Sequence, residues 1–231
     1  MGTKTDRGVR SLAGTVVAAV RADELRLGPA PTRWASGVYC LLDAVFRARA
    51  DYETIVRPML AERLAARPGM RDRATLRFRD LLDDVRGMRG DKHEAYAEVA
   101  LNRQQLAHRL KVSICCDAAE LLSRRKLETR RRLLALEPLE LEALACDELT
   151  RIRGFGGVLA RHWLAALGFE HAVRPDRDLR RFLERVTGWR PRAGDEDDDA
   201  RARAVIEAAA KRLRVAPLHV DAAIRRAEAA P

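Results

Sequence analysis

Residues 149–183 of the chain read LTRIRGFGGVLARHWLAALGFEHAVRPDRDLRRFL. This stretch begins with a glycine-rich turn, Gly154–Gly157, and continues with apolar residues at helical spacing. Glycine can adopt positive φ or admit another backbone closely, and the free N–H groups at a helix start bind anions. Three positive side chains lie near this turn: Arg151, Arg153 and Arg161. From these residues alone, the turn is either a phosphate-binding hairpin or an ordinary glycine-capped connection between helices.

The same stretch places an aspartate at the predicted start of the next helix. Asp176 follows Pro175, and apolar residues then recur at helical spacing until Gly188. Aspartate is among the best N-cap residues, and the helix dipole favours a second carboxylate, Asp178, in the first turn. Asp176 is therefore a predicted N-cap, with or without a further role.

The two halves together resemble the helix-hairpin-helix (HhH-GPD) superfamily of base-excision DNA glycosylases, the endonuclease III-like enzymes. The resemblance rests on GFGGVLA at 154–160 and VRPDRDLRRF at 173–182, and it covers about residues 141–188. It implies an all-α fold of two helical lobes with a DNA-binding cleft and a helix-hairpin-helix motif at the cleft mouth. It also implies that Asp176 is the catalytic aspartate, acting on a base flipped out of the duplex.

Two departures from the family pattern narrow the implied activity. Members that also cleave the DNA strand carry a lysine nucleophile in the second helix of the hairpin, where this chain has Val158. The resemblance therefore implies a monofunctional glycosylase without lyase activity, in which Asp176 stabilises the oxocarbenium-like state or orients the attacking water. Many relatives hold an iron–sulfur cluster with four closely spaced C-terminal cysteines. No cluster is expected here, because the cysteines lie upstream of the hairpin, at Cys40, Cys115, Cys116 and Cys146.

The resemblance also implies domain boundaries. Residues 1–35 form an N-terminal segment that pairs with the C-terminal lobe. Residues 36–168 form the central lobe, including the helix-hairpin-helix at about 141–167. Residues 169–231 form the C-terminal lobe, which carries Asp176.

Further site residues follow from their positions relative to the family motifs. The expected DNA-binding residues lie around the hairpin, beside Asp176, or at the turn where relatives insert a wedge: Arg151, Arg153, Gly154, Phe155, Gly156, Gly157, Arg161, Arg174, Arg177, Arg49 and Tyr52. For Arg49 and Tyr52, an ordinary surface position is the alternative. Asp43 lies near the position of a second catalytic acid in the adenine-specific branch, and a surface or capping role is its alternative. The family's hairpin cation implies a monovalent-cation site made by the main-chain carbonyls of Thr150, Ile152 and Phe155. The aromatic candidates for stacking a flipped base, or for the core, are Trp34, Tyr39, Phe46 and Trp163.

Composition agrees with a DNA-binding protein. The 231 residues include 44 Lys and Arg against 34 Asp and Glu, a formal net charge of +10 that favours a polyanionic partner. No stretch approaches the length of a membrane span, and the five histidines lack the spacing of zinc ligands. We expect a cytoplasmic monomer, nucleoid-associated in a prokaryote, that binds double-stranded DNA containing a modified or mispaired base and needs no cofactor.

Helical periodicity runs through nearly the whole chain. It predicts helices over residues 10–26, 35–49, 52–66, 73–85, 91–110, 112–123, 126–135, 139–151, 157–167, 176–187, 199–213 and 217–229. The acidic run Asp195–Asp199 is predicted as a solvated loop that caps the following helix.

Three functions stay open at this point. The first is a monofunctional DNA glycosylase, and the second is a catalytically inactive helix-hairpin-helix DNA-binding protein on the same scaffold. The third is a helical interaction module unrelated to DNA. The sequence does not identify the base: uracil, alkylated or oxidised purines, mispaired adenine and phage-type modified bases all fit.

Overall fold

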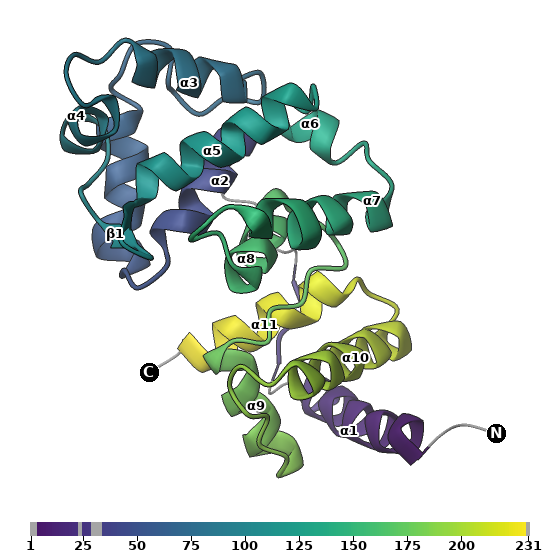
Figure 1. Cartoon of the computed structure of the whole chain (residues 1–231). Coiled ribbons are helices and arrows are strands. Elements are labelled where there is room, and N and C mark those ends of the chain that lie inside the picture. Colours follow the sequence, from purple (N-terminus) through teal and green to yellow (C-terminus); the bar gives the residue numbers. More distant parts are fainter. Residues whose placement is uncertain (1–3, 23–24, 29–33, 230–231) are drawn as a thin grey trace. The chain divides into compact units, whose positions relative to one another are not determined.

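The computed structural model of the protein describes residues 4–22, 25–28 and 34–229, with side chains from Gly8 to Glu228 within these ranges (Figure 1). About 64% of the protein is helical, and the described residues contain two short strands. This confirms the predicted, mostly helical class, while the DNA-binding cleft of the implied fold stays a prediction. The predicted extension of the first helix to residue 26 crosses residues 23–24, which lie outside the described residues. None of the described helices is long and apolar enough to cross a bilayer.

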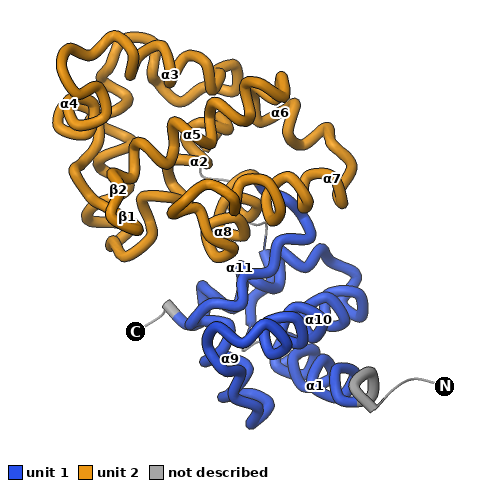
Figure 2. Tube along the Cα trace, in the orientation of Figure 1, with its two compact units in different colours: residues 1–31, 168–231 blue, residues 32–167 orange. Residues whose placement is uncertain are grey.

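The chain divides into two compact units (Figure 2). Unit 1 consists of residues 1–31 and 168–231, so it combines both ends of the chain, and unit 2 consists of residues 32–167. The helices of unit 1 are α1 (Lys4–Arg21), α9 (Arg177–Thr187), α10 (Glu196–Leu213) and α11 (Pro217–Ala229). Helix α1 packs on α9 and α10, and α11 packs on the same two helices. Their apolar faces enclose a core that includes Val16, Leu179, Phe182, Ile206 and Ile224.

Unit 2 is built around the buried helix α2 (Gly37–Phe46). This helix is buried at every position and packs on α5 (Lys111–Arg124) and α8 (Gly157–Leu167). The remaining helices of this unit are α3 (Phe78–Arg86), α4 (Lys92–Val99), α6 (Arg130–Leu133) and α7 (Pro138–Ala143). Shorter helical turns complete it: the π-helical η1 (Tyr52–Val56), η2 (Met59–Leu64) and η3 (Leu144–Glu148), and the 3-10 turn η4 (Leu149–Arg151).

The predicted helix over residues 52–66 is present from Tyr52 to Leu64, but it consists of two π-helical segments joined by an α-helical Arg57 and Pro58. Asp51 caps the first turn through its carboxylate, which accepts from the Thr54 N–H at 2.8 Å. The N–H of Arg57 then donates to the Tyr52 carbonyl five residues earlier, which is the π pattern. Proline has no N–H to donate to the preceding turn, but the chain stays helical through Pro58, with π geometry before and after it.

The predicted helix over residues 91–110 is wrong in its second half. Helix α4 ends at Val99, and the strands β1 (Gln105–Leu106) and β2 (Arg109–Leu110) form an antiparallel hairpin. Its two-residue turn needs positive φ at both positions, and Ala107 and His108 supply it at 51° and 61°. These residues give no glycine signal, so the sequence pattern did not indicate the turn.

A buried lysine lies just after this hairpin. Lys111 is 1% exposed, and its Nζ donates to the Phe46 carbonyl (2.9 Å), the Ala48 carbonyl (2.6 Å) and the Gln104 Oε1 (2.7 Å). Phe46 is the last residue of α2 and Ala48 lies in the turn that follows, where a helix leaves acceptors without partners. Burial lowers the pKa of Lys111 to about 8. The lysine therefore ties the start of α5 to the end of α2.

The acidic run lies in a helix and not in a loop. Helix α10 begins at Glu196, three residues before the predicted start. Asp195 is its N-cap, and the Asp195 carboxylate accepts from the Asp198 N–H at 3.0 Å. The predicted capping role is confirmed, and the carboxylates that follow lie where the helix dipole favours negative charge.

Candidate functional site

The glycine-rich turn connects η4 to α8 through two tight hydrogen-bonded turns. The Ile152 N–H donates to the Leu149 carbonyl (3.0 Å), and the Phe155 N–H donates to the Ile152 carbonyl (2.8 Å). Gly154 has φ of 96°, and a Cβ there would lie 2.5 Å from Ile114 Cδ1 on α5. Glycine is therefore required at this position both by the backbone conformation and by the packing.

The next two glycines are open to solvent. Gly156 and Gly157 are exposed, and a Cβ on either would meet no atom within 4 Å. Helix α8 starts at Gly157, and Val158 in its first turn is 69% exposed. The amide end of α8 is therefore an accessible backbone surface at the positive end of a helix dipole.

The three arginines predicted around the hairpin differ in their exposure and in their ion pairs. Arg151 and Arg153 are exposed, and neither side chain has an ion pair within the part of the chain that the structure describes. Arg161 lies 3.7 Å from Glu142 and is 21% exposed. Arg151 and Arg153 are therefore the better placed of the three to meet a phosphate.

The hairpin's predicted cation ligands are main-chain atoms. The Ile152 carbonyl already accepts the Phe155 N–H, and the Thr150 hydroxyl donates to the Cys146 carbonyl at 2.6 Å. The Phe155 side chain is fully buried, so the DNA contact predicted for Phe155 is restricted to its main chain. Across the described ranges, no group of three or more His, Cys, Asp or Glu could hold a metal ion. The monovalent-cation site stays a prediction.

Asp43 organises a set of aromatic and cationic side chains in unit 2. It is 3% exposed, and its Oδ2 accepts from the Trp34 Nε1 at 2.8 Å. Arg47, one helical turn later, donates its Nε to Asp43 Oδ1 at 3.0 Å. The Arg47 guanidinium also lies 4.1 Å from the centre of the Tyr52 ring. Asp43 is therefore a buried anchor, and both of its oxygens accept hydrogen bonds within the protein.

The side chains of Trp34 and Tyr52 line a pocket of about 490 Å³. Trp34 precedes α2, and Tyr52 begins the π-helical segment. The other lining residues all belong to that segment or adjoin it: Glu53, Arg57, Pro58, Ala61 and Glu62. The positions of Trp34 and Tyr52 are set by the Asp43 and Arg47 contacts, so these two walls are preorganised.

The other predicted aromatic and wedge residues lie elsewhere. Tyr39, Phe46 and Trp163 are fully buried and belong to the core of unit 2, which removes them as candidates for stacking on a flipped base. Arg49 is exposed and has φ of 57°, in the turn after α2. Tyr52 is half-buried against Arg47.

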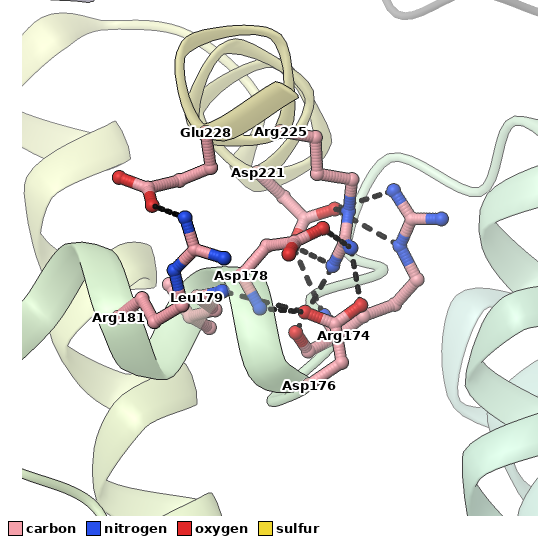
Figure 3. A network of polar contacts seen from close by, with 8 residues as sticks. All are labelled: Arg174, Asp176, Asp178, Leu179, Arg181, Asp221, Arg225 and Glu228. Atoms are coloured by element: carbon pink, nitrogen blue, oxygen red, sulfur yellow. Dashed lines mark hydrogen bonds and ion pairs between the residues drawn. The ribbon is translucent and has the colours of Figure 1, made fainter. Parts of the chain in front are cut away.

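Asp176 is confirmed as the N-cap of α9 (Figure 3). Its Oδ1 accepts from the N–H groups of Asp178 (3.1 Å) and Leu179 (3.3 Å). Its Oδ2 accepts from Nη1 of Arg225 on α11. The Asp176 side chain is 22% exposed, so the carboxylate is held by the protein and still reaches solvent.

Behind Asp176 lies a buried ion-pair network (Figure 3). Asp221 is 1% exposed and accepts from Arg174 Nη2 (2.9 Å) and Arg225 Nε (3.0 Å). Burial alone would raise the pKa of Asp221, but the charges of Arg174 and Arg225 bring it below its usual value. Burial lowers the pKa of Arg174. Burial would also lower the pKa of Arg225, but Asp221 and Asp176 raise it above its ordinary value.

The network changes the interpretation of the DNA contact predicted for Arg174 and leaves the one predicted for Arg177 unchanged. Arg174 is 12% exposed and its guanidinium is held by Asp221, which favours a structural role over the predicted phosphate contact. Arg177 is exposed at the first position of α9, and no ion pair involves it within the described residues. Arg177 therefore keeps the accessibility that a phosphate contact needs.

Comparison with known proteins places the chain in a family. Residues 12–229 match the family model described as Domain of unknown function (DUF8548). The chain belongs to this family. No curated protein and no solved structure matches it. The matched model is not that of the helix-hairpin-helix glycosylases, so that resemblance stays a prediction.

Sequence reasoning did not identify Asp221 or Arg225. They lie 45 or more residues after Asp176, on a helix that was predicted only from its apolar spacing. The available signal was their own spacing, because an acid and an arginine four residues apart lie on the same helix face. That signal is common on helix surfaces, so it did not distinguish a buried pair from a solvated one.

Proposed function

We propose that this protein is a monofunctional DNA glycosylase that hydrolyses the N-glycosidic bond of a damaged, mispaired or modified base in double-stranded DNA. The observation that carries the proposal is the Asp176 carboxylate, which is fixed by two backbone amides and Arg225 and is still 22% exposed. A fixed, accessible anion is what cleavage at C1′ requires, because positive charge develops on the sugar as the base leaves.

The hairpin of unit 2 is assigned to backbone binding. Its exposed glycines and the amide end of α8 offer N–H donors, and Arg151 and Arg153 add charge that no ion pair within the described residues neutralises. Contacts of this kind make binding strongly dependent on salt and weakly dependent on sequence.

Unit 2 also contains the pocket lined by Trp34 and Tyr52, and Asp43 and Arg47 hold these two side chains. The contacts of Asp43 favour the role of holding Trp34 and Arg47 over that of a second catalytic acid, because neither oxygen is left without a donor.

The reaction is a single displacement by water. The bond between C1′ and the base breaks, the base leaves with the bonding electrons and takes up a proton, and a water oxygen bonds to C1′. In this proposal, Asp176 stabilises the cationic sugar or orients that water. The hairpin position occupied by a lysine in bifunctional enzymes is Val158, whose side chain offers no amine for a Schiff base.

The pairing of Asp176 also favours a second candidate function. Both of its oxygens accept hydrogen bonds within unit 1, as in an N-cap that serves structure alone. A catalytically inactive DNA-binding protein on the same scaffold would keep every one of these contacts. The two candidates differ in base release and agree in DNA binding.

Duplexes that each carry one modified or mispaired base separate the candidates. We expect wild-type protein to release one class of base under single-turnover conditions, with strand breaks only after alkali. Asp176→Asn should bind the same duplex within about twofold, because asparagine is also a good N-cap, and should lose at least about 100-fold in rate. The matched control is Asp195→Asn, which makes the same change at the N-cap of α10.

Each alternative outcome has a defined meaning. Base release by Asp176→Asn at the wild-type rate contradicts the mechanism. Salt-sensitive binding without release from any duplex favours the inactive DNA-binding protein, and binding that is absent or insensitive to salt eliminates both.

A further inference from the structure

We propose that Arg225 is a positioning residue, which fixes the Asp176 carboxylate so that one oxygen, Oδ2, faces the substrate. The proposal rests on the glycosylase function above and adds a residue that the resemblance did not indicate. It depends only on contacts within unit 1, all of which are among the described residues.

The guanidinium of Arg225 makes a planar bridge between two helices. Its Nε and Nη2 donate to Asp221 Oδ2 and Oδ1 at 3.0 and 3.1 Å, so one edge of the fork binds the carboxylate side-on. Its Nη1 points away from that edge and donates to Asp176 Oδ2 (Figure 3). The bridge therefore joins α11 to the N-cap of α9.

Asp221 restricts the movement of the Arg225 guanidinium. It lies one helical turn before Arg225, is 1% exposed and also holds Arg174. If Arg225 rotated away, a buried carboxylate would lose half of its partners, which is strongly unfavourable at low exposure. The position of the Arg225 guanidinium is thus set by Asp221 and not by Asp176.

The same network fixes the backbone that carries Asp176. The Arg174 N–H donates to Asp221 Oδ1 at 3.2 Å. The Arg174 carbonyl accepts from the Asp176 N–H at 2.7 Å and from Arg225 Nη2 at 3.1 Å. Both the side chain and the main chain at residue 176 are therefore tied to α11.

These contacts leave one oxygen of Asp176 with spare accepting capacity. Oδ1 accepts two amide N–H groups, whereas Oδ2 accepts one N–H from Arg225, and a carboxylate oxygen has two lone pairs. Oδ2 can accept a further hydrogen bond or face a cationic sugar while Arg225 stays in place.

The charge balance keeps this end of the network negative. Three carboxylates, Asp176, Asp178 and Asp221, share two guanidiniums, those of Arg174 and Arg225. The carboxylates of Asp176 and Asp178 are 22% and 42% exposed, whereas Asp221 is 1% exposed. The two carboxylates of this group that reach solvent are therefore Asp176 and Asp178, and Arg225 orients Asp176 while it shares its charge with Asp221.

The test replaces the guanidinium of Arg225 by an ammonium group and keeps the positive charge. In Arg225→Lys, one ammonium cannot bind Asp221 side-on and reach Asp176 at the same time. On a duplex that the wild type cleaves, we expect the single-turnover rate to fall about 10- to 100-fold, as small misplacements of a reacting group do, with the DNA Kd within about twofold. The matched control is Arg226→Lys, at the exposed neighbouring position on α11, which should keep the wild-type rate. A wild-type rate for Arg225→Lys overturns the proposal, and so does a parallel loss of rate and DNA binding.

A second measurement needs no activity. Amide hydrogen exchange at Asp178 and Leu179 reports the cap made by Asp176 Oδ1, and the Asp198 amide in the Asp195 cap is an internal control. We expect about tenfold faster exchange at Asp178 and Leu179 in Arg225→Lys, with Asp198 unchanged. If the wild type releases no base from any duplex, the proposed function fails while this result still supports the positioning of Asp176. Unchanged exchange at Asp178 and Leu179 overturns the positioning itself.

Discussion

The two units bury charge in opposite ways. In unit 1, Asp221 is 1% exposed and faces two guanidiniums, whose charges bring its pKa below the usual value despite burial. In unit 2, Lys111 is equally buried, but its three partners are neutral oxygens, and burial lowers its pKa to about 8. The positive charges of Arg174 and Arg225 offset the cost of burying the Asp221 carboxylate. The neutral oxygen acceptors around Lys111 offset only part of the cost of burying its ammonium group. The ionised form is therefore favoured in one unit and disfavoured in the other.

The largest expected effect is that of Asp221→Ala. The substitution leaves Arg174 and Arg225 in a site of low exposure without their common carboxylate. Removing one partner of a buried pair costs about 3–5 kcal/mol. Urea unfolding followed by the fluorescence of Trp189, the tryptophan of unit 1, measures this loss. A loss below about 1 kcal/mol would mean that water replaces Asp221 and that the network is not truly buried.

Asp221 also makes the stability of unit 1 depend on pH in the acidic range. Because its folded pKa is lowered, its contribution to stability is complete above the unfolded pKa near 4 and is lost as pH falls through the folded pKa. The stability difference between wild type and Asp221→Asn should therefore be constant from pH 7 to about 5 and shrink below pH 4. A difference that grows on acidification would reverse the assigned direction.

The next largest effect is an increase in the stability of unit 2 at alkaline pH. Between pH 8 and 10.5 the folded protein has lost the Lys111 proton while the unfolded chain still holds it, so stability rises with pH. The gain is about 3 kcal/mol at most. Buried thiols oppose it, because burial raises the pKa of Cys40 and Cys116 to about 12. The measurement is therefore the difference between wild type and Lys111→Met across this range, and a flat difference would contradict it.

Asp43→Asn should have a smaller effect, because unit 2 holds this carboxylate with one arginine that is 28% exposed. Asparagine keeps an acceptor for Trp34 and loses the charge that faces Arg47. We expect a loss of about 1–2 kcal/mol, since the partner can regain water. Thermal unfolding measures it, and a loss as large as that of Asp221→Ala would show that the two units do not differ.

Asp178→Asn should have the smallest effect. Asp178 is 42% exposed and lies 3.7 Å from Arg225, at the edge of the unit 1 network. Solvent screens such a pair, so the change in unfolding free energy should be below about 0.5 kcal/mol. A larger change would extend the rigid part of the network to the first turn of α9.

Local signals in the sequence predicted much of this structure. Asp176 and Gly188 bound α9 as expected, because an N-cap side chain and a glycine with positive φ act within one helical turn. The β1–β2 hairpin was missed because Ala107 and His108 adopt positive φ only in this folded context. The bridge from Arg225 to Asp176 was missed for a related reason. It depends on α11 packing beside α9, and helical periodicity does not identify which helices pack together.

The division of the chain into units also sets an order of assembly. Unit 2 is continuous in sequence, whereas α1 of unit 1 packs on α10, whose residues are made roughly 190 positions later. During synthesis, domains made of consecutive residues fold as they emerge. Unit 2 can therefore fold on the ribosome while Ala13, Val16 and Val17 of α1 still lack the helices that cover them. If synthesis stops before α10, this apolar face of α1 stays without the helix that covers most of it.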